Sequence, residues 1–272
     1  MKRILILAAT MLMAAACGNN KTDMKALVLY YSQGGNTKAV AEEIAGRLGA
    51  DIEAIEPMVP YNGDFMATIE RGKKELETGI LPEIQPVKAD IRSYDVIFLG
   101  FPVWFGVYAT PVFTVLETEA FKGKKIVPFC TFGSGGLDSS SRALEEKLPD
   151  SEILPGYGVR AARMDAAPAE IDRFLKENGY IEGKVTPLDP FPEPHPASPE
   201  ESAVFDAAVD GYPMLNAKAE EAASRSVPGG TEYLFTAKDL QRQGSGTADA
   251  RSIKVYVLAE DGKAPVFTQV IR

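Results

Sequence analysis

Apolar runs alternate with amphipathic stretches over residues 24–181. Runs typical of buried strands lie at Ala26–Tyr31, Asp51–Ile55, Val96–Gly100, Lys125–Cys130 and Ile153–Val159. Between them, apolar residues at helical spacing predict helices over Thr37–Leu48, Phe65–Glu77, Thr110–Leu116, Ser140–Leu148 and Pro168–Asn178. Five pairs of strand and helix predict a doubly wound α/β domain over residues 24–182. Its sheet is expected to be parallel, with a ligand outside the carboxyl ends of the strands.

Prolines dominate the next segment, residues 183–199. They stand at Pro187, Pro190, Pro192, Pro194, Pro196 and Pro199. Because proline lacks a backbone N–H, this spacing excludes a helix or a central strand and predicts a stiff linker. The linker holds His195, the only histidine, which has no Cys or His nearby. We expect His195 to be solvated, and we expect no metal site.

Residues 200–272 predict a second, small module. Apolar residues at roughly helical spacing predict a helix over Pro199–Ser226, ended or bent at Pro213. Three β-rich runs follow, at Thr231–Ala237, Ser252–Ala259 and Pro265–Ile271, and an Asp-Gly turn joins the last two. One helix across an antiparallel sheet is an α+β arrangement.

The N-terminus, residues 1–23, reads as a signal and tether. Met1-Lys2-Arg3 precedes a short apolar run that ends in three alanines before Cys17. Small residues directly before a cysteine resemble the lipobox of bacterial lipoproteins, in which Cys17 would be diacylated; the alternative is an ordinary signal with an incidental cysteine. The lipobox predicts a lipid-anchored, extracytoplasmic protein of the cell envelope, on the periplasmic side rather than at the cell surface.

The net charge and the cysteine content exclude some classes of protein. The formal charge is −9, and loss of Lys2 and Arg3 with the signal makes it two units more negative. A chain this acidic lacks the excess of positive charge that proteins use to bind nucleic acid. Cys130 would be the only thiol left beside a lipidated Cys17, which excludes a disulfide framework. Because it lies within the apolar run 126–130, we expect a small core residue rather than a redox thiol.

The loop after the first strand suits an anion. It comprises Ser32, Gln33, Gly34, Gly35, Asn36 and Thr37, with no charged side chain. Backbone N–H groups, hydroxyls, the Asn36 amide and the helix dipole would hold a phosphate there. The spacing matches neither a P-loop nor a dinucleotide fingerprint. The alternative is a strand-to-helix turn in which these residues act only as caps.

Two more loops follow the third and fourth strands. The first, Phe101–Tyr108, carries the only tryptophan beside other aromatic residues, and the second, Thr131–Ser141, is rich in glycine and serine. Both would lie beside the phosphate loop at the carboxyl edge of the sheet. Together they predict a slot for a flat ring with polar edges attached to a phosphate, which describes FMN.

The segments S-Q-G-G-N-T, F-L-G-F-P-V-W-F-G and P-F-C-T-F-G-S-G-G resemble the flavodoxin family over Met24–Ile181. The resemblance implies a five-stranded sheet of order 2-1-3-4-5, non-covalent FMN, and redox chemistry carried by the flavin without a catalytic side chain. It assigns the phosphate to residues 32–37. It assigns one face of the ring to Pro102, Val103, Trp104, Phe105 and Gly106, and its edge and far side to Thr131, Phe132, Gly133, Ser134 and Gly135.

One position departs from that family's pattern. Related members commonly read S-x-T-G-N-T, and Gly34 stands here in place of the threonine. One hydroxyl donor to the phosphate is therefore missing. A lost hydrogen bond to a charged group costs about 1.5–3 kcal/mol, so FMN binding is expected to be weaker but not abolished.

The tail resembles cystatin-like domains. Arg225–Phe235 and Ile253–Val257 are similar to the helix end, first hairpin loop and later strand of those domains. Ser226 stands in place of the loop glutamine and Pro228 is additional, so we do not expect protease inhibition. We expect a structural or partner-docking module that takes no part in the flavin site, because all three loops precede the linker.

Two functions follow from these patterns. The first is an FMN-binding redox lipoprotein engaged in electron transfer or quinone-reductase-type chemistry. Its partner would be a redox protein or a membrane quinone, since soluble NAD(P)H is not expected outside the cytoplasm. The alternative is a flavodoxin fold with weak or lost cofactor that serves as a membrane-tethered binding protein.

Overall fold

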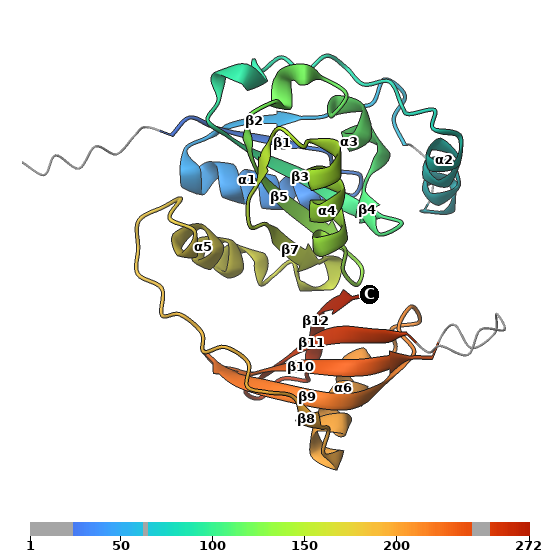
Figure 1. Ribbon diagram of the computed structural model, residues 1–272, viewed down its shortest axis with the longest axis vertical. Coiled ribbons are helices and arrows are strands. Elements are labelled where there is room, and N and C mark those ends of the chain that lie inside the picture. Colours follow the sequence, from blue (N-terminus) through green and yellow to red (C-terminus); the bar gives the residue numbers. More distant parts are fainter. Residues whose placement is uncertain (1–23, 62–64, 241–250) are drawn as a thin grey trace, which may run out of the picture.

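The structure, a computed structural model, describes residues 24–61, 65–240 and 251–272. The predicted signal and Cys17 lie outside the described residues. An α/β module and a C-terminal sheet module stack along the long axis, and the linker runs down one side (Figure 1). In the described part of the chain, no helix is both long and apolar enough to cross a bilayer.

A sheet of seven strands forms the centre of the first module. Its main path is β2-β1-β3-β5-β6, in which neighbours are parallel. Strand β4 adds antiparallel to β3, and β7 adds parallel to β5. The predicted order 2-1-3-4-5 is confirmed, because the fourth predicted strand is β5. The bounds are β1 (Ala26–Tyr30), β2 (Asp51–Ala54), β3 (Val96–Trp104), β4 (Val107–Tyr108), β5 (Lys125–Phe132), β6 (Glu152–Ile153) and β7 (Tyr157–Arg160).

The predicted fifth strand is divided in two. Strand β6 ends at Ile153 and β7 begins at Tyr157, and both pair with β5. Between them, Pro155 has no N–H for the ladder. A Cβ on Gly156 would collide with the carbonyl oxygen of Pro128, so the chain passes close against β5 at this point. The break therefore follows from the Pro-Gly pair.

Helices cover both faces of this sheet (Figure 1). Helices α1 and α5 bury apolar residues against one face, and α3 and α4 against the other. The bounds are α1 (Asn36–Leu48), α2 (Phe65–Thr78), α3 (Thr110–Val115), α4 (Leu137–Lys147) and α5 (Ala167–Glu177), with 3-10 turns at Ile91–Ser93, Glu119–Phe121 and Ala161–Arg163.

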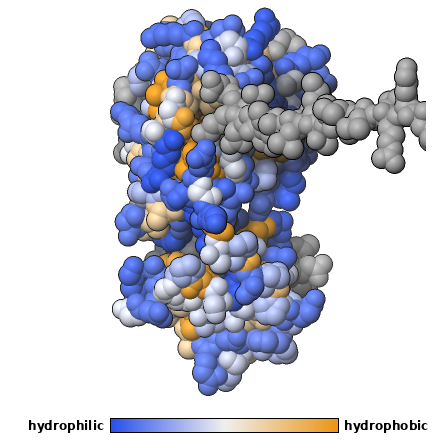
Figure 2. All heavy atoms as spheres, turned by 90° about the vertical axis from the view of Figure 1, so that its left-hand side faces the viewer, coloured by the Kyte–Doolittle hydropathy of each residue, from blue (hydrophilic) through white to orange (hydrophobic). Residues whose placement is uncertain are grey.

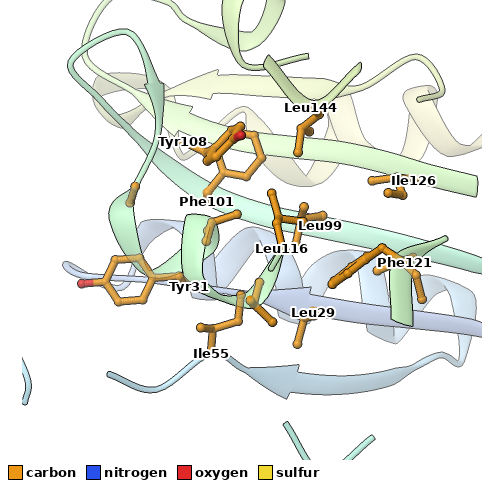
Figure 3. Close-up of a cluster of buried hydrophobic side chains, with 14 of the residues drawn as sticks. Leu29, Tyr31, Ile55, Leu99, Phe101, Tyr108, Leu116, Phe121, Ile126 and Leu144 are labelled. Carbon is orange, nitrogen blue, oxygen red and sulfur yellow. The ribbon is translucent and has the colours of Figure 1, made fainter. Parts of the chain in front are cut away.

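Alternate residues of each central strand enter different cores. In β1, Leu27 and Leu29 face the core under α3 and α4, whereas Val28 faces the core under α1 and α5. Figure 3 shows the first core, in which Leu29, Leu99 and Phe121 converge. Burial on both faces explains why these strands are continuously apolar. Each large side chain buried here contributes about 1.5–3 kcal/mol.

The second module is one helix across an antiparallel sheet of order β12-β11-β10-β9-β8. Ser198 and Glu201 form a capping box at the start of the helix, and Phe205 packs edge-on against Phe235 with ring centroids 5.2 Å apart. The bounds are β8 (His195–Pro196), α6 (Pro199–Val209), β9 (Ala217–Val227), β10 (Gly230–Asp239), β11 (Ser252–Glu260) and β12 (Val266–Ile271).

The predicted helix over Pro199–Ser226 is wrong in its second half. Helix α6 ends at Val209, and residues 217–227 form strand β9, which pairs with β10. The alanines of this segment favour a helix locally. In the sheet, however, Ala222 is fully buried in the core that α6 covers. Tertiary packing therefore overrides local propensity here.

The end of the linker forms part of the second sheet. His195 and Pro196 pair with Ala222 and Glu221 as the short edge strand β8. This position suits a proline, which cannot donate to a second neighbour. His195 is exposed, and its Nε2 lies 3.7 Å from the Glu201 carboxylate.

An open cleft separates the modules over part of their facing surfaces. The molecule narrows between them (Figure 2). The cleft measures about 810 Å³, and α5 and the β9-β10 hairpin contribute to its walls. Charged residues along it form ion pairs with one another, such as Arg163 with Glu170 and Arg225 with Glu232.

Candidate functional site

The loop after β1 leads directly into the N-terminus of α1. Gly35 is the N-cap residue, with a left-handed φ of 91° that favours glycine. The Ser32 hydroxyl oxygen accepts hydrogen bonds from the amides of Gly35 and Lys38, at 3.2 and 3.1 Å. Its own O–H stays available to donate outward. Within the described residues, the amides of Asn36 and Thr37 have no hydrogen-bond acceptor.

This loop is open on its outer side. A Cβ built on Gly34 or Gly35 would meet nothing within 4 Å. An anion can therefore approach the backbone amides and the positive end of the α1 dipole. The donors that face this space fit a phosphate group.

Two side chains predicted to face the phosphate are used within the protein. The Gln33 side chain accepts from the Tyr31 hydroxyl at 2.7 Å and donates to the Tyr61 carbonyl at 2.6 Å. The Thr37 hydroxyl is buried and lies 2.8 Å from the hydroxyl of Thr131. The phosphate donors that remain are Ser32, Asn36 and the backbone amides.

The second predicted loop is a tight turn at the end of β3. Phe105 and Gly106 have left-handed φ values of 53° and 87°, and the chain returns as β4. Trp104 is half-buried and meets Tyr31 and Tyr61 edge-on, at centroid distances of 5.7 and 5.1 Å. Phe105 is 51% exposed at the tip. The turn therefore offers one fixed and one exposed aromatic ring.

A buried polar network that was not predicted from the sequence lies behind Trp104. The Glu75 carboxylate accepts hydrogen bonds from Tyr61 and Thr110, both at 2.6 Å, and from Arg71 at 2.8 Å. The Arg71 guanidinium lies 3.7 Å from the centre of the Tyr61 ring. Burial, and then the bond to Glu75, raises the pKa of Tyr61 far above its usual value. The spacing of Arg71 and Glu75, four residues apart on a helix, was the one available signal.

The third predicted loop, after β5, touches the second. Thr131 and Phe132 are buried, whereas Gly133 is exposed. Ser139 donates a short hydrogen bond to the carbonyl of Gly106. A Cβ on Gly136 would overlap the side chain of Val103, so the Gly136 backbone packs directly against that side chain.

The three loops thus form one connected edge. Thr37 joins the first loop to the third, Gln33 joins the first to the aromatic cluster through Tyr61, and Ser139 joins the third to the second. The three loops lie at the carboxyl ends of β1, β3 and β5, which is where an open α/β sheet binds its ligand. The structure therefore brings together the segments that the sequence assigned to one site.

A family model described as flavodoxin matches residues 25–172, which is more than half of the chain. The chain belongs to the flavodoxin family. The predicted fold class is confirmed for this part of the chain. Membership of this family confirms the prediction of FMN as the cofactor.

Individual relatives match between about half and three quarters of the chain. A Clostridioides difficile protein named flavodoxin-like domain-containing protein BilS is 26% identical over 202 residues, 71% of this flavodoxin and 97% of that protein. A crystallised Bacteroides eggerthii protein, assigned as a flavoprotein, is 31% identical, with a TM-score of 0.47 over 54% of this chain and 96% of that one. A Lactobacillus acidophilus flavoprotein crystallised in complex with FMN is 26% identical, with a TM-score of 0.47 over 56% and 99%.

The C-terminal module contacts the third loop of this flavodoxin, and its sequence shows no sign of this contact. The amide of Val270, in β12, donates to the carbonyl of Ser134 at 2.7 Å. Arg272 and Gln269 reach Ser134 and Asp138, at 3.2 and 3.3 Å. The tail was expected to take no part in the flavin site, and these bonds place it against one of the three predicted loops.

Cys130 is expected to be unreactive in the folded protein. It is fully buried in the core below the third loop, and burial raises the pKa of its thiol far above the usual range. Burial therefore disfavours the reactive thiolate in the folded protein. In a Cys17→Ser chain, a thiol reagent should label Cys130 only after unfolding in urea. Rapid labelling of the native chain would contradict the packing described here.

Proposed function

We propose that this flavodoxin binds FMN non-covalently at the edge formed by its three loops and works as a redox protein. The observation that carries the proposal is the open N-terminus of α1, beside a half-buried aromatic platform. Its Asn36 and Thr37 amides have no acceptor in the described part of the chain, and the Ser32 hydroxyl lies next to them. Ser32, the Asn36 side chain and the backbone amides of Asn36 and Thr37 would hold the phosphate. Residues 102–106 and 131–135 would enclose the ring.

Bound FMN would supply the electron-transfer chemistry itself. The role of the chain is then to bind the flavin, to orient it and to shield it from solvent. The Tyr61–Glu75 network holds Trp104 in place from behind, and the contact of Ser139 with Gly106 holds the second and third loops together. No side chain of the edge is required as a general acid or base.

The visible spectrum of the purified chain tests this proposal. Material expressed with ample flavin, or mixed with FMN and passed through a desalting column, should be yellow and should release FMN on denaturation. A colourless chain that takes up no FMN supports the second function, a tethered binding protein. That function is favoured by Gly34 and by the internal hydrogen bonds of Gln33 and Thr37, which leave fewer phosphate donors.

For location, we propose a lipid anchor at Cys17 and a place on the extracytoplasmic side of a membrane. The support is the charged start, the short apolar run and the three alanines before Cys17. A membrane quinone or a redox protein of the envelope would then exchange electrons with the site.

Cys17→Ser is expected to block lipidation and processing. The uncleaved precursor should accumulate and run larger than the mature chain on a gel, and labelled fatty acid should not be incorporated. Ser32→Ala, which leaves the signal intact, serves as the control. Normal cleavage and release of the Cys17→Ser chain would identify an ordinary secretory signal.

The C-terminal module is proposed to be cystatin-like. A helix followed by an antiparallel meander, with Pro228 and Gly229 in the first hairpin turn, supports this assignment. Because the loop lacks the glutamine of inhibitory cystatins, we propose a structural role and no inhibition of proteases.

A further inference from the structure

Arg160 lies where the two modules meet. It ends β7, is only 8% exposed, and belongs to the α/β module by sequence. Its Nε donates to the carbonyl of Gly133 and its Nη1 to the carbonyl of Phe267, both at 2.8 Å. Gly133 belongs to the third predicted flavin loop, and Phe267 to β12 of the other module. One side chain therefore ties that loop to the C-terminal sheet.

Aromatic residues of the C-terminal module enclose the guanidinium. Its central carbon lies 3.4 Å from the centre of the Phe267 ring and 5.2 Å from that of Tyr212. Within the described part of the chain, no carboxylate forms an ion pair with Arg160. A buried arginine held by two carbonyls and by aromatic faces keeps its guanidinium in one orientation, because its Nε and Nη1 donors have fixed acceptors.

The same loop is held from outside by β12. The Val270 amide points away from its own sheet to the Ser134 carbonyl, and Gly135 lies so close to Val270 that a Cβ there would overlap the strand. A Cβ on Gly133 would stand 2.9 Å from the Tyr212 hydroxyl. Figure 1 shows β12 rising from the C-terminal sheet toward β7 and the start of α4.

We propose that the C-terminal module completes the flavin site: Arg160 and Val270 fix the Gly133–Gly135 backbone from outside, and Arg160 is the positioning residue of this contact. A glycine-rich loop that is ordered in advance loses less conformational entropy when it closes on a ligand. The C-terminal module therefore sets how well the third loop meets FMN. This inference rests on the proposed function, but its first readout does not.

Hydrogen exchange on the full mature chain without cofactor is that first readout. Arg160→Ala and Val270→Pro should each speed exchange of the loop amides at 133–137 at least about tenfold. Proline is tolerated where an edge-strand N–H points away from the sheet. Arg163→Ala, which removes a neighbouring arginine without loop contacts, and Val270→Ala, which keeps the N–H, are the matched controls. Both control variants should leave the exchange rates of the loop amides unchanged.

Titration with FMN is the second readout. The two loop-releasing variants should bind FMN about tenfold more weakly than their controls. Unchanged loop exchange in both variants, or faster exchange without loss of affinity, would overturn the inference and leave the proposed function standing. A wild-type chain that binds no FMN would overturn both. If Arg160→Ala does not fold, Val270→Pro against Val270→Ala decides the matter alone.

Discussion

Replacing Gly34 with threonine is expected to tighten FMN binding by roughly one to two decades. The new hydroxyl would add one donor to the phosphate shell, and a hydrogen bond to a charged group contributes about 1.5–3 kcal/mol. The loop can accept the side chain, because a Cβ at Gly34 meets nothing within 4 Å and its φ is not left-handed. The dissociation constants of the two chains, measured by quenching of FMN fluorescence, test this expectation.

Gly34→Val is the matched control for this substitution. Valine has the shape of threonine and the same restricted backbone, but no hydroxyl. It should leave the affinity unchanged or lower it slightly. Equal affinities for the threonine and valine chains would show that the phosphate does not lie at this loop in the way proposed.

Replacing Glu75 with alanine is expected to lower the free energy of unfolding by about 3 kcal/mol. Three donors, from Tyr61, Thr110 and Arg71, would lose their acceptor in a largely buried place. Removing one partner of a buried charged network typically costs about 3–5 kcal/mol, and the partial exposure of Arg71 argues for the lower end. Urea unfolding followed by the fluorescence of Trp104, the only tryptophan, measures the loss.

Glu77→Ala provides the comparison on the same helix. Glu77 is 64% exposed and faces Lys73 at 3.6 Å, so its removal should change stability by less than about 0.5 kcal/mol. The Glu75 variant should also show altered Trp104 emission in the native state, because Tyr61 packs on the indole. A stability equal to that of the Glu77 variant would contradict the role assigned to the network.

Much of the α/β module could be predicted from its sequence because local and tertiary signals agree there. Strands such as β3 and β5 are buried on both faces and therefore read as unbroken apolar runs. The loop at residues 32–37 was recognisable from its local sequence, since a glycine-rich turn that leads into a helix N-terminus is a common anion-binding arrangement.

The features that sequence missed depend on contacts between distant segments. Residues 217–226 have helical propensity, and pairing with β10 and β8 makes them a strand. The Glu75 network needs Tyr61 from a loop and Thr110 from α3. The contact of Val270 with Ser134 joins residues of different modules across the linker. Local sequence patterns do not reveal contacts between segments that lie so far apart in the chain.

A paired titration with FMN and riboflavin tests the central claim most directly. Riboflavin carries the same ring without the phosphate, so the comparison isolates the donors at the start of α1. With residues 21–272, FMN fluorescence should be quenched to a 1:1 end point, and riboflavin should bind at least about a hundredfold more weakly, as expected when more than one hydrogen bond to a charged group is lost. No quenching at high micromolar FMN, or equal binding of the two flavins, would contradict the account.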